Sequence, residues 1–328
     1  MEVEHIENPI KVNFIKSEIP IIFLDSNIII EINKVLKNKC NSNYTDELKE
    51  IISLLKSKSK QNIIIVPYAD QEDEVDYKKQ DSNNIDFLFE ISNGNQFKNH
   101  LLIQDEQKKR FFKAFLNNEL SVNIDYQEGF NEINKQPGES HIFIKGLLNI
   151  FGNNTIKLLQ DEKKCRTEKL QEYQQNLNKN ETYKEHLGFE LLYEFKKIDK
   201  ISKKTIDGNT LSNDELTFLN SITDYKEKDN TTRIINIATF YSDFYWFAVP
   251  YVDIERNLYT YISLYEKFKP GDNKDIINAS CYLPYCNYYF TDKSMCRILQ
   301  ELDIDKKYNV KIYSFKNIKE FLEELKKI

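Results

Sequence analysis

Acidic residues stand at or near the ends of several apolar segments, where their side chains could share one site. The four candidates are Asp25, Glu72, Asp275 and Asp292. The first and the last directly follow the apolar runs 21–24 and 288–291, the second follows Val66 by six residues, and the third opens a predicted helix. Because functional groups of an open parallel sheet gather beyond the carboxyl ends of its strands, we expect these four carboxylates to converge.

Carboxylates gathered in one cleft favour the binding of a cation. Each negative neighbour raises the pKa of the others, so they stay ionised together only when a cation is present. Oxygen-only ligands suit Mg²⁺ or Mn²⁺, which keep several bound waters. Such an ion lowers the pKa of bound water and neutralises charge on a phosphate, so the matching reaction is hydrolysis of a phosphodiester.

Several neighbouring acids could supply the second carboxylate of the site. Asp70, Glu72, Asp73 and Glu74 crowd one turn after Pro67. Helix geometry lets only one or two of the four face a common site. Their distance from the preceding strand favours Glu72, whereas a charge run at a helix start is also typical of a solvated face.

Apolar patterns at both ends of the chain predict an α/β fold. Near the N-terminus they predict strands over 21–24 and 63–66 and helices over 27–37 and 45–56. Near the C-terminus they predict strands over 288–291 and 310–313, a helix beginning at about 275, and helices over 293–302 and 317–327. The strands are continuous apolar runs, which is typical of a parallel sheet with helices on both faces.

The middle of the chain has a different pattern. Its apolar residues recur at three- and four-residue spacing among Lys, Glu, Gln and Asn, which favours helices. One short strand is predicted over 121–125, and no repeat recurs. We therefore predict a discontinuous core, residues 1–80 and 272–328, interrupted by a mostly helical insertion over 81–271.

Three stretches together resemble PIN domain nucleases, which are related to flap endonucleases. They are the segment 21–27 (IIFLDSN), the acidic run after Pro67, and the segment 275–292 (DIINASCYLPYCNYYFTD). The resemblance implies a PIN-like α/β core, a Mg²⁺- or Mn²⁺-dependent nuclease activity, and Asp25, Glu72, Asp275 and Asp292 as the metal-binding carboxylates. It also implies that Ser26 and Asn27 orient metal-bound water or fix the turn. Larger relatives with a Leu-Pro-Tyr-Cys stretch are expected to carry aspartate where this chain has Asn287.

Charge and composition limit how the chain could bind a nucleic acid. The net charge is −6 and the pI about 5.5, so a phosphate backbone can be bound only by a basic surface confined to one part of the molecule. Candidate basic groups for that surface are Lys108, Lys109, Arg110, Lys113, Lys163, Lys164, Arg166, Lys169, Lys196, Lys197, Lys203 and Lys204. The aromatic stretch 240–247 could stack bases, but its density favours a core role.

Cysteine and histidine spacing indicates neither a disulfide framework nor a zinc site. The five cysteines are odd in number without a C-x-x-C pair, and the four histidines lie far apart. Cys281, Cys286 and Cys296 are predicted to be buried free thiols. With no secretory leader and no apolar stretch long enough to span a membrane, a cytoplasmic location is expected.

We therefore predict an endonuclease that hydrolyses RNA with Mg²⁺ or Mn²⁺, in the setting of a toxin or defence effector that an antitoxin or regulatory protein could control. Two alternatives stay open. The first is a structure-specific DNA nuclease, because carboxylate chemistry acts on the phosphate and does not need the 2′-hydroxyl. The second is an inactive PIN-like scaffold that binds nucleic acid or protein.

Overall fold

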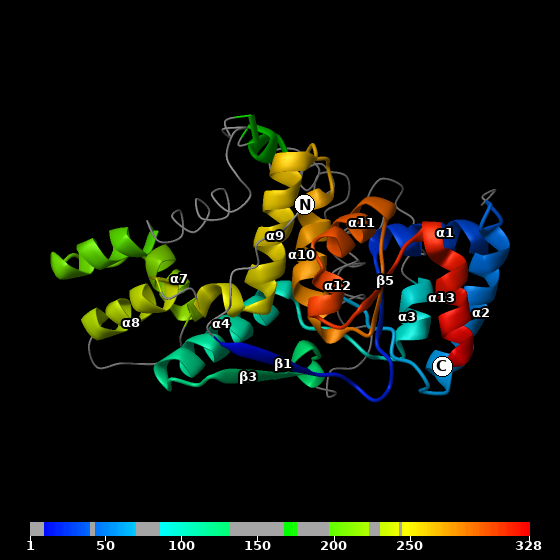
Figure 1. Cartoon of the computed structure of the whole chain (residues 1–328), viewed down its shortest axis with the longest axis horizontal. Helices are drawn as coiled ribbons and strands as arrows, with labels where there is room; N and C mark the ends of the chain where they lie inside the picture. Colours follow the sequence, from blue (N-terminus) through cyan, green and yellow to red (C-terminus); the bar gives the residue numbers. More distant parts are fainter. Residues whose placement is uncertain are drawn as a thin grey trace, which may run out of the picture.

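The computed structural model describes residues 10–39, 43–69, 86–131, 167–172, 174–175, 197–222, 230–242 and 245–328. Over these residues the chain is a mixed α/β protein, mostly helical with small parallel sheets, which agrees with the predicted class (Figure 1). None of the described helices is both long and apolar enough to cross a membrane.

The main sheet joins segments from the two ends of the chain. Its strands are β2 (Ile22–Leu24), β4 (Tyr288–Phe290) and β5 (Lys311–Tyr313), in the order β2-β4-β5 and all parallel. Phe23 is paired with Tyr289, 266 residues later. The strands predicted over 21–24, 288–291 and 310–313 are therefore confirmed within one residue at each end.

The strand predicted over 63–66 is reduced to a single parallel bridge between Ile21 and Ile65. Ile22 N donates to Ile65 O at 2.8 Å, and Ile65 N donates to Pro20 O at 2.9 Å. The next bond of this parallel ladder would need an N–H at residue 67, and proline has none. Pro67 therefore ends the pairing after one bridge, although Ile64 and Val66 are buried as expected.

One face of the sheet is covered by helices from both ends of the chain. They are α1 (Ser26–Leu36), α2 (Thr45–Lys60), α3 (Asp86–Ser92) and α13 (Ile318–Lys327). Their buried residues form one cluster with Ile22, Leu24 and Phe290 of the sheet. The helices predicted over 27–37, 45–56 and 317–327 are thereby confirmed, the second continuing for four more residues.

The opposite face carries Phe23 and Tyr289, because successive side chains of a strand alternate between faces. It is covered by α9 (Pro250–Tyr265), α10 (Asp272–Tyr282), α11 (Lys293–Glu301) and α12 (Ile304–Lys307). A short 3₁₀ turn, η5 (Leu283–Tyr285), joins α10 to β4, and η6 (Phe315–Asn317) joins β5 to α13. Helices thus cover both faces of the sheet, as predicted.

A second, two-stranded parallel sheet lies outside the first. It pairs β1 (Lys11–Ile15), which the sequence analysis did not predict, with β3 (Ser121–Asp125), which it did. Asn13 Nδ2 donates to Asn123 Oδ1 at 3.0 Å across the pair. The 3₁₀ turn η3 (Tyr126–Gly129) follows β3 directly.

The described part of the predicted insertion is largely helical. It contains α4 (His100–Leu116), a helical segment over 197–206, α7 (Asn213–Ile222), α8 (Asn230–Ser242) and the turn η4 (Tyr245–Ala248). Figure 1 shows α7 and α8 at the end of the molecule opposite α1 and α2. Phe240, Trp246 and Phe247 are almost fully buried, so the core role predicted for this aromatic stretch is confirmed at the described positions.

Buried polar contacts tie this part to the sheet. Gln107 of α4 donates from Nε2 to the hydroxyl of Tyr285 at 2.9 Å and accepts from the backbone N–H of Tyr251 at 3.0 Å. The same hydrophobic cluster contains Phe111 of α4 and Phe23 of β2. The described cysteines, Cys281, Cys286 and Cys296, are free and buried, as predicted.

Candidate active site at the strand ends

Asp25 is fixed at the carboxyl end of β2. Its backbone N–H donates to Phe290 O at 2.9 Å, which extends the pairing of β2 with β4 and sets Asp25 beside Thr291. Oδ1 accepts from Ser26 N at 2.7 Å, and Oδ2 accepts from the Thr291 hydroxyl at 2.7 Å. Asp25 and Thr291 are both fully buried. A buried carboxylate needs such donors, because burial without them is costly.

Asp292 stands in the equivalent place after β4 and begins α11. Its Oδ1 accepts from Ser294 N at 2.6 Å and from Met295 N at 3.2 Å, which caps the helix. A carboxylate at this position interacts favourably with the positive end of the helix dipole and so stabilises the start of α11. Asp292 is partly buried. The side chain is therefore held in place while part of it still reaches the surface.

Helix α10 brings a third aspartate to the same edge. The ring of Tyr282 stacks on Phe23, with centroids 5.3 Å apart, so this face of α10 lies against the sheet. Asp275 lies seven residues before Tyr282, which is two helical turns along the same face. α10 leads through η5 into the start of β4, so it runs antiparallel to the strands and its beginning lies at their carboxyl ends.

The phenol of Tyr289 lies near all three aspartates. Tyr289 is fully buried, and burial raises the pKa of its hydroxyl well above 10.0, with further contributions from the negative charges of Asp25, Asp275 and Asp292. A charge acts appreciably on a titrating group only when it lies near. The three described members of the predicted acidic set therefore lie on the same side of the sheet, in the neighbourhood of one buried hydroxyl.

A further acid, Asp272, was missed by the sequence analysis. It begins α10, and its Oδ2 accepts from Lys269 N at 2.7 Å. Burial raises the pKa of Asp272, and the nearby charges of Asp292 and Glu266 raise it further. The signal was present in the sequence, because Asp272 lies three residues before Asp275 and so shares its side of the helix.

The remaining predicted acid, Glu72, lies outside the described residues, as do its alternatives Asp70, Asp73 and Glu74. Asn287, where relatives are expected to carry aspartate, has a structural role. Its Oδ1 accepts from the backbone N–H of Ile21 at 2.9 Å at the start of the sheet, the end opposite the aspartates.

Three polar side chains beside the aspartates are buried without a partner among the described residues. The unpartnered atoms are Ser26 Oγ, the Tyr289 hydroxyl oxygen, and both amide atoms of Asn278. Ser26 is 2% exposed, and Asn278 and Tyr289 are fully buried. Native proteins satisfy nearly all such atoms through protein, water or an ion, so a concentration of them is unusual.

The donor chemistry fits a hard cation that keeps part of its water. Within the described ranges, no three His, Cys, Asp or Glu side chains lie close enough together to form a metal-binding group by themselves. Mg²⁺ is usually held by one or two carboxylates, with waters completing its octahedral shell. Oxygen-only acids next to unpartnered buried polar atoms meet that requirement.

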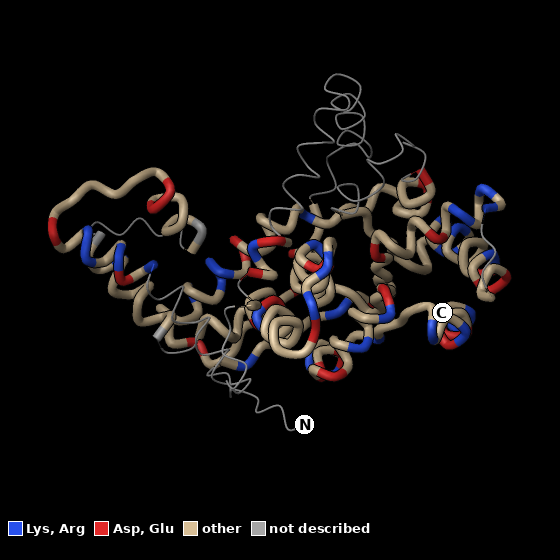
Figure 2. Tube along the Cα trace, turned by 90° about the horizontal axis from the view of Figure 1, so that it is seen from above, with Lys and Arg blue, Asp and Glu red and all other residues tan. Residues whose placement is uncertain are grey.

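Four of the eight described basic residues proposed to bind phosphate form ion pairs within the chain. Lys108 pairs with Asp105 at 2.9 Å, Arg110 with Glu128, Lys203 with Asp199 at 2.7 Å, and Lys204 with Glu215 at 2.7 Å. Residues 163, 164, 166 and 196 lie outside the described ranges. Figure 2 shows basic and acidic residues interspersed along the described helices. Exposed pairs of this kind are weak, so their lysines can exchange partners.

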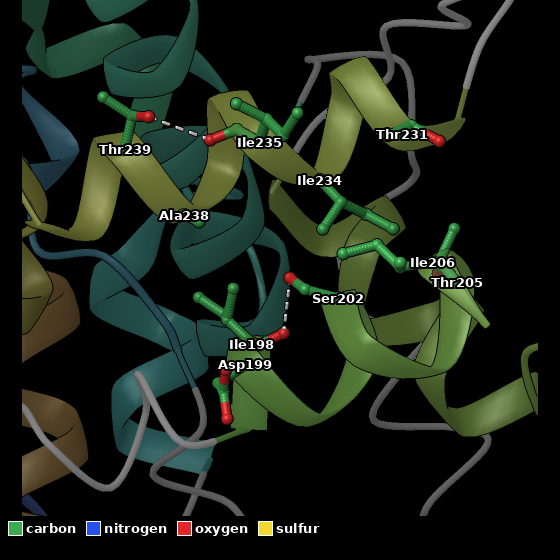
Figure 3. A pocket seen from close by; sticks show the side chains of 10 residues that line it. All are labelled: Ile198, Asp199, Ser202, Thr205, Ile206, Thr231, Ile234, Ile235, Ala238 and Thr239. Carbon is green, nitrogen blue, oxygen red and sulfur yellow. Dashed lines mark hydrogen bonds between the residues drawn. The ribbon is translucent and has the colours of Figure 1, made fainter.

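A hollow of about 320 Å³ lies elsewhere, between the segment 197–206 and α8 (Figure 3). Its polar groups are mostly engaged: Ser202 Oγ donates to Ile198 O at 2.8 Å, and Thr239 Oγ1 to Ile235 O at 3.0 Å. Its one charged lining residue, Asp199, pairs with Lys203. This hollow offers no group for acid–base or nucleophilic chemistry comparable to the strand-end aspartates.

Comparison with models of known families, with curated proteins and with solved structures finds no match to this chain. The resemblance to PIN nucleases therefore stays a prediction from the sequence. The functional assignment has to rest on the strand-end aspartates and their surroundings.

Proposed function

We propose that this chain is a PIN-like, metal-dependent endonuclease that hydrolyses RNA at the strand-end aspartates. The observation that carries the proposal is that the charges of Asp25, Asp275 and Asp292 all act on the buried Tyr289 hydroxyl. Asp25 lies 250 or more residues before the other two in the chain, and the pairing of β2 with β4 joins these two parts of the chain. Convergent acids at the carboxyl ends of parallel strands are the expected place for a site in this class of fold.

Each acid has a separate supporting structure that suits a fixed ligand. Thr291 and the N–H of Ser26 hold both oxygens of Asp25, and the start of α11 holds Oδ1 of Asp292. Asp275 approaches from α10, a separate element. Ligands held in this way need no rearrangement when substrate arrives, which is the main requirement for electrostatic catalysis.

The residues that would hold Mg²⁺ or Mn²⁺ are Asp25, Asp275 and Asp292, with Glu72 as the predicted fourth. Such an ion supplies activation of water and neutralisation of charge on the phosphate. The fixed aspartates would hold the ion in place. Asp275 and Asp292 are only partly buried, so both lie where the site reaches the surface, whereas Asp25 is fully buried.

The test is cleavage of end-labelled single-stranded RNA, the matching single-stranded DNA and a DNA flap by the purified full chain. Each substrate is incubated with Mn²⁺, Mg²⁺ or EDTA, and with wild type and Asp292→Asn. Asparagine is as good a helix cap as aspartate, so the variant keeps α11 while it loses the charge. We expect wild type with Mn²⁺ or Mg²⁺ to cut RNA internally, with EDTA and Asp292→Asn abolishing cleavage.

Other outcomes overturn the proposal in defined ways. Cleavage of the DNA flap but not of RNA would replace the ribonuclease with a structure-specific DNA nuclease. Absence of cleavage of all three substrates, together with absence of Mn²⁺ binding, would leave the PIN-like scaffold. Equal cleavage by wild type and Asp292→Asn would show that the activity belongs to another site or to a contaminant.

A further inference from the structure

Two of the three unpartnered polar side chains, Tyr289 and Asn278, lie on the same side of the sheet as the aspartates. Tyr289 lies beside Phe23 in the pairing of β2 with β4, and the two rings stack at 5.1 Å. Because alternate residues of a strand share a face, Tyr289, Thr291 and Asp25 all face α10. The unpartnered hydroxyl of Tyr289 therefore lies between the sheet and that helix.

Helix geometry places Asn278 level with Asp25. Asn278 precedes Tyr282 by four residues, so it lies one turn, about 6 Å, nearer the carboxyl ends of the strands. Tyr282 stacks on Phe23, and Asp25 lies two strand residues, or about 6.6 Å, beyond Phe23 in the same direction. The fully buried Asn278 amide therefore faces the end of β2 where Asp25 stands.

Burying these polar atoms destabilises the fold unless each has a hydrogen-bond partner. A buried donor or acceptor without a partner loses its hydrogen bonds to water and gains none in return. The amide of Asn278 brings two donors and an acceptor, and each hydroxyl brings one donor and acceptor sites. A set of this kind matches bound water molecules, which typically make about three hydrogen bonds each.

We propose that Asn278 and Tyr289 hold water molecules of the cation's hydration shell, so that the aspartates bind Mg²⁺ or Mn²⁺ in hydrated form. This inference rests on the proposed metal site but assigns residues beyond the four acids and beyond Ser26 and Asn27. The two residues act through water as positioning residues. Water that binds a cation through its oxygen points its hydrogens outward, so Oδ1 of Asn278 and the hydroxyl oxygen of Tyr289 accept hydrogen bonds from it. The Asn278 N–H groups and the Tyr289 O–H are then free to donate to further water molecules.

The test compares two Tyr→Phe variants of the full chain by Mn²⁺ titration calorimetry and by urea unfolding in EDTA. Tyr289→Phe removes a hydroxyl without a described partner. Its control, Tyr308→Phe, removes a buried hydroxyl that donates to Asp253 Oδ2 at 2.7 Å. We expect Tyr289→Phe to raise the Kd for Mn²⁺ by about 10-fold or more, as for loss of an outer-shell partner, without lowering metal-free stability. Tyr308→Phe is expected to lower the metal-free stability and to leave the Kd for Mn²⁺ unchanged.

Asn278 is tested in the same assays. Asn278→Leu, which has a similar volume but no polar atom, is expected to raise the Kd for Mn²⁺ by about 10- to 100-fold. Asn278→Asp keeps an oxygen at the position and is expected to restore binding to within about 3-fold of wild type. If Asn278→Leu does not fold by circular dichroism, Tyr289→Phe decides the question alone.

The outcomes separate this inference from the proposed function. Mn²⁺ binding that is lost in Asp25→Asn but is within 2-fold of wild type in Tyr289→Phe and Asn278→Leu would overturn the inference and leave the metal site in place. Absence of Mn²⁺ binding by wild type would overturn both. Loss of metal-free stability in Tyr289→Phe equal to that in Tyr308→Phe would show that Tyr289 has a structural partner instead.

Discussion

The hydroxyl of Thr291 donates a hydrogen bond of 2.7 Å to Oδ2 of Asp25, joining the ends of two strands that are 266 residues apart in the chain. Both side chains are fully buried. The bond fixes a carboxylate at the strand ends and depends on the pairing of β2 with β4. It therefore links the stability of the fold to the geometry of the proposed site.

Thr291→Val tests that link. Valine has the same shape but leaves Oδ2 of the buried Asp25 without this donor, so we expect a loss of about 1–3 kcal/mol in the free energy of unfolding. Urea unfolding measures the loss. Thr239→Val is the control, because Thr239 is exposed and its hydroxyl donates to Ile235 O within its own helix, and a change within about 0.5 kcal/mol is expected. Equal effects at the two positions would contradict the account.

Gln107→Met tests how α4 is held against the rest of the chain. Gln107 is 4% exposed and satisfies both the Tyr285 hydroxyl and the Tyr251 N–H. Methionine matches its volume but leaves both groups buried without this partner, so we expect a loss of about 2 kcal/mol or more. The exposed Gln127→Met serves as the control. A loss below about 0.5 kcal/mol at Gln107 would show that the two groups find other partners.

Gly129→Ala tests the contact between η3 and η5. A Cβ at this position would lie 2.8 Å from Cγ of the buried Tyr285 ring, closer than side chains tolerate. Overpacking of this kind costs about 1–3 kcal/mol. Repeating the substitution in a Tyr285→Leu background should reduce the cost, because the ring is then absent. An equal cost in both backgrounds would place the strain elsewhere.

The stability of the protein should rise with pH above about 8 because of Lys16. Its Nζ donates to Pro284 O at 2.9 Å and to Cys286 O at 2.6 Å, and burial lowers its pKa from 10.5 to about 8. Between these values the unfolded chain binds a proton that the folded chain has released, so the free energy of unfolding increases with pH.

The rise is expected to end near pH 9. Burial raises the pKa of Cys286 from 9.0 to about 12 and also raises the pKa of Cys296 above 9.0, so at higher pH the unfolded chain ionises thiols that the folded chain keeps neutral. Tyr289 and Tyr308, whose pKa values burial raises well above 10.0, add to this effect above pH 10. Urea midpoints at pH 7, 7.5, 8, 8.5 and 9 give the slope, and Lys16→Met should flatten it. A wild-type slope that persists unchanged in Lys16→Met would assign the effect to other groups.

The sequence predicted the main sheet well because its strands carry a strong local signal. The runs ending at Leu24, Phe290 and Tyr313 are continuously apolar or aromatic at the positions that the sheet buries, and a capping aspartate follows the first two. Such runs are typical of strands covered on both faces. Their order in the sheet was not predictable from any one of them.

The weaker elements depend on partners far away in the chain. β1 has no fully buried residue in its run Lys11–Ile15, and it forms only by pairing with β3 about 110 residues later. The sequence predicted a full strand around Ile65, where the structure has a single bridge. The hydrophobic pattern does not show which backbone N–H groups a strand pairing needs, so it could not show that the missing N–H of Pro67 ends the pairing.

The acidic part of the site was largely predictable, whereas its polar lining was not. Asp25 and Asp292 were found because both end an apolar run, and Asp275 because it opens a helix. Asn278, Tyr289 and Thr291 look like ordinary residues of a helix and a strand in the sequence. Their importance appears only when α10 is placed over β2 and β4.

The most direct test of the central claim is the initial rate of RNA cleavage at saturating Mn²⁺ for wild type, Asp25→Asn, Asp292→Asn and Asp214→Asn. Asp214 lies exposed on α7 and controls for loss of one negative charge. The account predicts a rate at least about 100-fold lower for the first two variants, since each removes a fixed charge from the site, and an unchanged rate for Asp214→Asn. Cleavage by folded Asp25→Asn and Asp292→Asn at the wild-type rate would contradict it.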